Sequence, residues 1–188
     1  LVFDNKVILG TRARKTRTKS FNAFSSIDYP ETAVFRDMRL IPFLRRPDPM
    51  PPVQFYGQLD PAVFVLRLVP GMRADIIPLL APHYRALVVE SFGVGGLPGG
   101  EHGEMYARLQ DWCTSGRVAV FTTQVPHEGC DLAVYEVGRS VKELPGVLEA
   151  KDMTPEAVAV KLMWALGQTT DRAEAMRLFT TPVEWDIV

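Results

Sequence analysis

The spacing of hydrophobic residues becomes regular at about residue 63. Beyond that point, nearly continuous apolar runs alternate with stretches typical of short or amphipathic helices. Such runs are typical of strands buried on both faces in a parallel sheet. The predicted strands are 63–70, 85–93 and 117–126, and the predicted helices are 72–84, 101–116, 154–168 and 171–181. The alternation predicts an α/β domain of three layers, with helices on both faces of the sheet.

Capping signals fix the ends of two of these helices. Thr154 is a good N-cap, Pro155 suits the first helical position and Glu156 lies in the first turn. Gly116 closes the helix over 101–116 as a C-cap residue. Residues 130–144 open as a loop and then continue as either a strand or a helical turn.

The first 62 residues follow a different pattern. Residues 1–9 predict a strand that Gly10 ends, and the run of basic residues over 12–19 follows as a loop. The chain then shows no regular period. Residues 38–62 include a run with four prolines in six positions, which stiffens the chain towards an extended form. We expect three parts: an N-terminal segment over 1–37, a linker over 38–62 and an α/β domain over 63–188. Because the chain opens on a strand without an initiator methionine, we also expect it to begin within a longer protein.

Composition excludes several classes of protein. The formal net charge is -1 and the pI is about 6.4, which argues against a nucleic-acid partner. No apolar stretch is long enough to span a membrane. Cys113 and Cys130 have neither C-x-x-C nor metal-ligand spacing, so they predict reduced thiols in a cytoplasmic protein. The three histidines are scattered, and we predict no metal and no cofactor.

Two loops follow predicted strands and could hold a ligand. The glycine-rich stretch 93–100 matches neither the P-loop nor the full G-x-G-x-x-G pattern, so a tight turn or close approach to a small substrate is the alternative. The loop 122–131 carries hydroxyls, an amide and carboxylates that could bind a small polar ligand or be solvated. No Ser-His-Asp set or G-x-S-x-G elbow completes a catalytic site.

A basic run is the remaining candidate. Five cations occupy eight positions between Arg12 and Lys19 with no acidic residue among them. A solvated face is the default interpretation of such a run. A lysine among cations can also act as a base, because its neighbours lower its pKa. Lys15 lies in the middle of the run.

Several segments together resemble the C-terminal half of the bacterial-type L-asparaginases, in particular the cytoplasmic type I branch. These segments are "SFGVGGLPG", "FTTQVPHEG", "VYEVGR" and above all "DMTPEAVAVKLMWALGQ". "GTRARKTRTKSFNAFSSIDYP" resembles the end of the family's large N-terminal α/β domain, and "LVPGMRADII" resembles the start of its small C-terminal domain. The resemblance covers nearly the whole chain and is weakest in the linker.

The resemblance implies hydrolysis of the side-chain amide of asparagine, and more slowly of glutamine. The family's catalytic lysine lies in a K-T-x-T segment, which here is Lys15 followed by Thr16 and Thr18. It would help to deprotonate a threonine nucleophile. The segments that carry the nucleophile and the Thr-Asp pair are not in this chain, which would therefore be inactive alone. The resemblance also implies a homodimer or homotetramer with sites shared between subunits.

A second departure concerns the glycine loop. The family usually reads G-V-G-N there, and the asparagine reaches the substrate in the partner's site; this chain has Gly96. Glu136, in "VYEVGR", is a second candidate for the cross-subunit contact. Two other hypotheses stay open. The chain could be a non-catalytic amino-acid-binding module, or it could be the asparaginase-like subunit of a tRNA-dependent amidotransferase, which also contains a segment similar to "DMTPEA".

Overall fold

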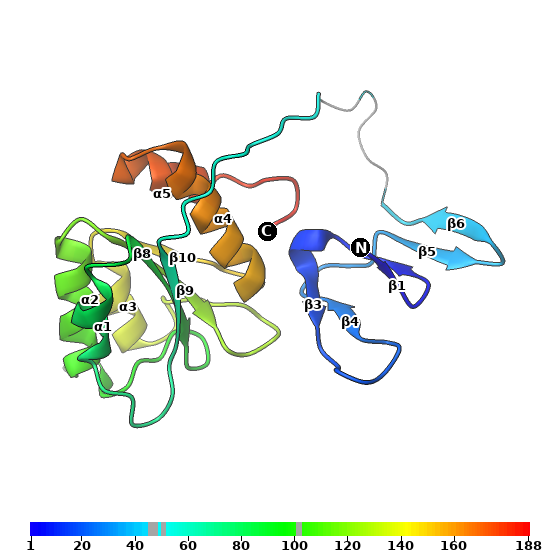
Figure 1. Cartoon of the computed structure of the whole chain (residues 1–188). Helices are drawn as coiled ribbons and strands as arrows, with labels where there is room; N and C mark the ends of the chain where they lie inside the picture. Colours follow the sequence, from blue (N-terminus) through cyan, green and yellow to red (C-terminus); the bar gives the residue numbers. More distant parts are fainter. Residues whose placement is uncertain (45–48, 50–51, 101–102) are drawn as a thin grey trace.

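The structure is a computed structural model that describes residues 1–44, 49, 52–100 and 103–188. A C-terminal α/β domain carries most of the helices and strands, and an N-terminal part made of short strands lies beside it (Figure 1). Side chains from the N-terminal part contact the end of the C-terminal domain, as described below.

A parallel sheet forms the centre of the C-terminal domain. Its strands are β7 (Val63–Arg67), β8 (Ala86–Ser91), β9 (Val118–Thr123) and β10 (Val147–Glu149). They lie in the order β10-β9-β8-β7, and every neighbouring pair is parallel. The three strands predicted from the sequence are confirmed. β10 was not predicted, because it is only three residues long and half-buried.

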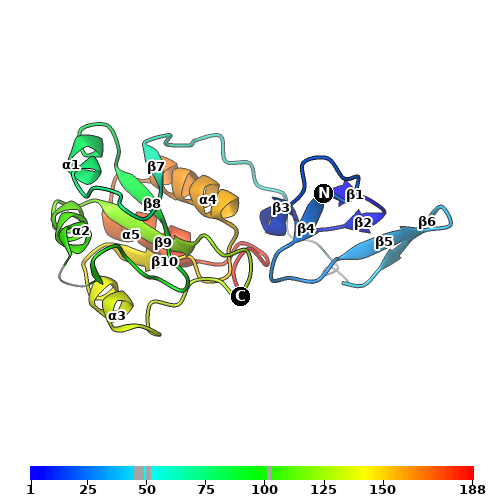
Figure 2. The same ribbon diagram turned by 90° about the horizontal axis from the view of Figure 1, so that it is seen from below.

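Helices cover both faces of this sheet, as predicted. On one face lie α1 (Ile76–Leu80), α2 (Glu104–Thr114) and α3 (Glu136–Lys142), and on the other lie α4 (Pro155–Gln168) and α5 (Arg172–Thr180) (Figures 1 and 2). The stretch over 130–144, for which a strand or a helical turn was open, therefore contains a helix. The domain has the three-layer α/β fold that the sequence indicated.

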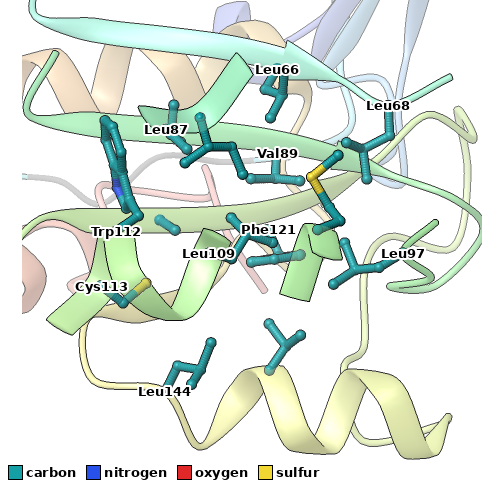
Figure 3. Packing of buried hydrophobic residues seen from close by; sticks show 14 of the residues in the cluster. Leu66, Leu68, Leu87, Val89, Leu97, Leu109, Trp112, Cys113, Phe121 and Leu144 are labelled. Atoms are coloured by element: carbon teal, nitrogen blue, oxygen red, sulfur yellow. The ribbon is translucent and has the colours of Figure 1, made fainter. Parts of the chain in front are cut away.

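The core consists of two apolar clusters, one on each side of the sheet. Leu87 and Val89 of β8 point towards α1–α3, where Leu109 packs against Phe121 of β9 (Figure 3). Ala86, Val88, Val118 and Val120 belong to the other cluster, with α4 and α5. Every residue of β8 and β9 is buried, and each strand opens with a continuous apolar run, over 86–89 and 118–121, before two buried polar residues end it.

The predicted caps are present. The Thr154 hydroxyl accepts a hydrogen bond from the Ala157 amide at 3.2 Å, and Pro155 is the first residue of α4. Gly116 lies just beyond α2 with φ of +89°, the left-handed conformation that a C-terminal glycine allows.

The N-terminal part is built from short antiparallel strands. Four of them form a sheet in the order β1-β2-β5-β6: β1 (Val2–Phe3), β2 (Lys6–Val7), β5 (Ala33–Arg36) and β6 (Arg39–Pro42). The prediction of one strand over 1–9 is wrong, because Asp4 and Asn5 have positive φ and turn the chain into a hairpin.

The basic run was predicted to be a loop, and the structure corrects this. A 3₁₀ turn, η1 (Gly10–Arg12), leads into β3 (Ala13–Lys15), which pairs antiparallel with β4 (Phe24–Ser26). Each strand is only three residues long, so the alternation of apolar and polar residues is too short to predict it from the sequence.

The range 38–62 begins with strand β6 and continues as extended chain from Pro52 onwards. Residues 45–48 and 50–51, which hold part of the proline-rich stretch, lie outside the described residues. The later part runs along α4 (Figure 1): the Asp60 amide donates to the Met163 carbonyl at 2.9 Å, and the Gln168 side-chain amide donates to the Gln58 carbonyl at 2.9 Å.

Candidate active site

Lys15 is the last residue of β3, and it pairs with Phe24 of β4. Its side chain is exposed and makes no hydrogen bond or ion pair with any residue that the structure describes. Thr16 follows on the same edge, and its hydroxyl lies 2.9 Å from that of Ser25. A lysine in this position is available to a substrate or to another part of the protein.

The glycine-rich stretch after β8 forms a tight turn, one of the two structures predicted for it. The Gly96 amide donates to the Phe92 carbonyl at 2.7 Å, and the Phe92 amide donates back at 3.1 Å. Gly95 has φ of +148°, and a Cβ there would lie 2.6 Å from a methyl carbon of Leu132. Gly96 is half-buried, and a Cβ there would lie 3.1 Å from the Phe92 carbonyl oxygen.

The loop after β9 uses its first polar side chains to hold the edge of the sheet. Thr123 donates to the Gly93 carbonyl, and Gln124 donates to the carbonyls of Leu68 and Glu90 at 2.6 and 2.9 Å. These contacts tie together the chain that follows β7, β8 and β9. The amide and hydroxyl that the sequence offered as ligand groups therefore have structural partners.

The rest of this loop faces the N-terminal part. His127 Nδ1 lies 3.1 Å from one carboxylate oxygen of Asp28, and the Glu128 amide donates to the other at 3.0 Å. Glu128 adopts φ of +75°, which turns its amide towards Asp28. One carboxylate thus joins the edge of the C-terminal domain to the segment that follows β4.

Glu136 is the first residue of α3, and its side chain is exposed. The helix lies close to the preceding loop, because a Cβ on Gly138 would come within 2.4 Å of the Leu132 carbonyl oxygen. Gly95 and Gly138, which are close in sequence to Gly96 and Glu136, therefore both border Leu132. Within the part of the chain that the structure describes, no hydrogen bond or ion pair joins Gly96 or Glu136 to Lys15.

Arg12 was predicted to lie on a solvated face, and this is wrong. It is fully buried, with Nε donating to the Trp185 carbonyl at 2.8 Å and Nη1 donating to the Asp152 carboxylate at 2.8 Å. Its guanidinium lies 5.3 Å from the centre of the Tyr29 ring. Because Lys15 follows only three positions later, Arg12 fixes where β3 lies against the C-terminal domain. No sequence signal separates it from its exposed neighbours.

The cysteine thiols and the potential metal ligands offer no further site. Burial raises the pKa of Cys113 to about 11 and that of Cys130 to about 12, so neither is a ready nucleophile. Among the residues that the structure covers, no cluster of histidine, cysteine and carboxylate side chains could hold a metal ion. Over the same residues no helix has the length and apolarity needed to cross a membrane.

The fold and these loops define a three-layer α/β domain with candidate ligand loops at the carboxyl edge of its sheet. Residues 62–179 match the model of the glutaminase/asparaginase C-terminal domain. The chain belongs to the asparaginase family.

Relatives extend this assignment over the rest of the chain. An L-asparaginase of Thermococcus kodakarensis is 35% identical over 191 residues, which cover 100% of this chain and 56% of the relative. The solved thermostable L-asparaginase from that organism superposes with a TM-score of 0.91 at 34% identity, covering 99% of this chain and 56% of the other. L-asparaginase I from Vibrio cholerae gives a TM-score of 0.85 at 25% identity, with coverage of 100% and 56%.

A second type of relative also matches. A component of the glutamyl-tRNA(Gln) amidotransferase of Metallosphaera sedula is 35% identical over 179 residues, covering 92% of this chain and 39% of the relative. The chain thus spans about half the length of the asparaginases that it matches, and less of the amidotransferase component.

Proposed function

We propose that the protein to which this chain belongs is an L-asparaginase, which hydrolyses the side-chain amide of asparagine to aspartate and ammonia. One observation carries the proposal: the match to an L-asparaginase covers the whole chain, including the basic segment with Lys15, at a TM-score of 0.91. We also propose that the protein is cytoplasmic, which fits its two free, buried thiols.

Lys15 is the catalytic residue that this chain contributes. It would take the proton of a threonine hydroxyl, directly or through a neighbouring hydroxyl, as that oxygen attacks the amide carbon. Ammonia then leaves, and water hydrolyses the resulting acyl-enzyme. The nucleophile would come from the part of the protein outside this chain, so the chain alone is expected to be inactive.

The test is ammonia release from asparagine and glutamine by the full-length protein. K15M should abolish release, because no other lysine lies at the end of β3. The matched control is K19M, which removes an exposed lysine of the same run and should leave the rate unchanged. Full activity of K15M would refute the role of Lys15. Inactivity of the wild-type protein on both amides would favour a binding module instead.

We propose that Gly96 and Glu136 contact substrate in the partner subunit's site of a homodimer or homotetramer. The exposed apolar residues of the β5–β6 hairpin are available to the rest of the protein or to a second subunit, and they include Phe35, Met38, Leu40, Ile41 and Phe43. E136Q should raise KM for asparagine more than it lowers kcat, whereas E143Q, at the other end of α3, should change neither. Light scattering would give the oligomeric state.

The amidotransferase component is the second candidate, supported by the 35% identity to the Metallosphaera sedula protein. That protein is named as part of an amidotransferase for glutamyl-tRNA(Gln). A full-length protein that released ammonia from glutamine only in the presence of glutamyl-tRNA and partner proteins would establish this alternative. Asparagine hydrolysis without any partner would exclude it.

A further inference from the structure

A concave site lies at the edge of the parallel sheet opposite the candidate ligand loops. A cavity of about 440 Å³ opens where the chain enters β8 and β9 and where α5 begins. The residues that line it include three arginines, Arg85, Arg117 and Arg172, beside His83, Tyr84, Ser115 and Thr170. None of the described residues that line it is acidic.

Arg117 is held rigidly in this cavity by neutral partners. Its Nη1 donates to the Ser115 hydroxyl at 2.6 Å and its Nη2 donates to the Ala81 carbonyl at 2.7 Å, while Nε lies 3.3 Å from the Tyr84 carbonyl. The guanidinium also lies 5.1 Å from the centre of the Trp112 ring. No carboxylate among the described residues pairs with it, so its positive charge is fixed in place and uncompensated.

Arg172 carries a second uncompensated charge. Its Nη1 donates to the Cys113 carbonyl at 3.0 Å, and no described carboxylate forms an ion pair with it. A Cβ on Gly146 would lie 3.2 Å from this nitrogen, so the guanidinium fits closely against the backbone there. Arg85 differs, because Asp60 pairs with it at 2.6 Å.

We propose that this cavity binds a small, multiply charged oxyanion between Arg117 and Arg172. Two guanidinium groups that share a cavity repel each other until an anion lies between them, and a planar guanidinium presents paired N–H donors to a carboxylate or a phosphate. The cavity has room for a ligand larger than one phosphate group. The ligand's oxyanion groups are either carboxylates, as in a tricarboxylate, or phosphoryl oxygens.

The oxyanion site is separate from the candidate active site. Arg117 directly precedes β9, whereas the loops around Gly96 and Gln124 follow the carboxyl ends of β8 and β9. Six strand residues lie between the two edges, about 20 Å at the rise of an extended chain. The proposal therefore does not depend on the hydrolysis of asparagine.

The test is calorimetric titration of the full-length protein with citrate and with inorganic phosphate, against sodium chloride at equal ionic strength. We expect saturable binding of at least one of the two probes and none of chloride. Tight citrate binding would identify a carboxylate ligand, and tight phosphate binding a phosphoryl ligand. No saturable binding of either probe would overturn the proposal.

Variants locate the site. R172Q should weaken binding at least tenfold, because it removes one of the two uncompensated charges. R108Q removes an exposed arginine of α2, outside the cavity, and should bind as the wild type does. R172K keeps the charge and should bind more tightly than R172Q even if both lose stability with the contact to Cys113. Equal affinity of R172Q and wild type would overturn the proposal, whatever the ammonia assay shows.

Discussion

At the scale of single residues, a buried ion pair in the C-terminal domain carries a large desolvation cost. Lys161 and Asp186 form an ion pair of 2.7 Å with side chains only 5% and 4% exposed. The ammonium also donates to the Thr181 carbonyl at 2.8 Å, and the carboxylate accepts from the Val183 amide at 2.8 Å. These extra bonds offset part of the cost of removing two charges from water.

Replacing one residue of the ion pair should make the desolvation cost of the other measurable as a loss of stability. K161M leaves Asp186 buried without its cation and should lower the free energy of unfolding by about 3–5 kcal/mol. The double variant K161M/D186L should recover part of the loss, because it buries no charge. Urea denaturation of the three proteins measures both effects. A loss below about 1 kcal/mol in K161M would show that the pair contributes little.

The two thiols predict how stability changes at high pH. Burial raises the pKa of Cys113 from 9.0 to about 11 and that of Cys130 to about 12. The unfolded state therefore releases these protons first, so the free energy of unfolding should fall as pH rises from about 9 towards 11. C113A should show a smaller fall than wild type. At pH 8 neither thiol of the folded protein should react with a disulfide reagent, and rapid reaction would contradict their burial.

Single residues also show why the candidate site could be predicted only in part. The glycine turn and the N-cap of α4 depend on neighbours in the sequence, so local patterns reveal them. Arg12 and Arg14 look alike in the sequence, yet one is fully buried and the other is 3.7 Å from the exposed carboxylate of Glu156. The carboxylate partner of Arg12 lies 140 residues away, and no local pattern could identify it.

At the scale of elements, length and burial decide what the sequence reveals. β8 and β9 are six residues long and buried throughout, so their apolar runs predict them well. β1, β2 and β10 are two or three residues long and only partly buried, so they leave almost no pattern. Their positions depend on pairing with neighbouring strands, which is a property of the folded chain.

Gly167 lies where α4 contacts the extended segment before β7, so we expect stability to be sensitive to substitution of this glycine. A Cβ at this position would lie 2.6 Å from the Gln58 carbonyl oxygen and 3.0 Å from the Leu59 Cα atom. Gly to Ala in an exposed helix stabilises by about 1 kcal/mol, but here we expect G167A to destabilise by about 1–3 kcal/mol.

Two measurements check this expectation. Urea denaturation gives the sign of the change in stability. Limited proteolysis between residues 52 and 60 reports whether the segment has left the helix, and G167A should be cut faster there than wild type. A more stable G167A with unchanged proteolysis would show that the segment does not press on α4.

At the scale of the whole molecule, Arg12 joins the N-terminal part to the C-terminal domain. R12M should lower the free energy of unfolding by about 3–5 kcal/mol, because it leaves Asp152 without its cation and the Trp185 carbonyl without a donor. R14M, two residues along, should cost less than about 1 kcal/mol.

Hydrogen exchange distinguishes a lost contact from a general loss of stability. In R12M, exchange should rise first in residues 183–188, where the arginine holds the backbone. Uniform acceleration across the whole chain, or equal effects of R12M and R14M, would contradict the role of Arg12 as the joint between the two parts.

The same contact bears on how the protein is made. Trp185 follows Arg12 by 173 residues, so a ribosome adding about 5–20 residues per second adds Arg12 roughly 9–35 seconds before Trp185. Throughout that interval Arg12 Nε lacks the carbonyl that it will bind, although Asp152 is already part of the chain for the last stage of it. The bond from Arg12 Nε to the Trp185 carbonyl can therefore form only after translation has passed Trp185.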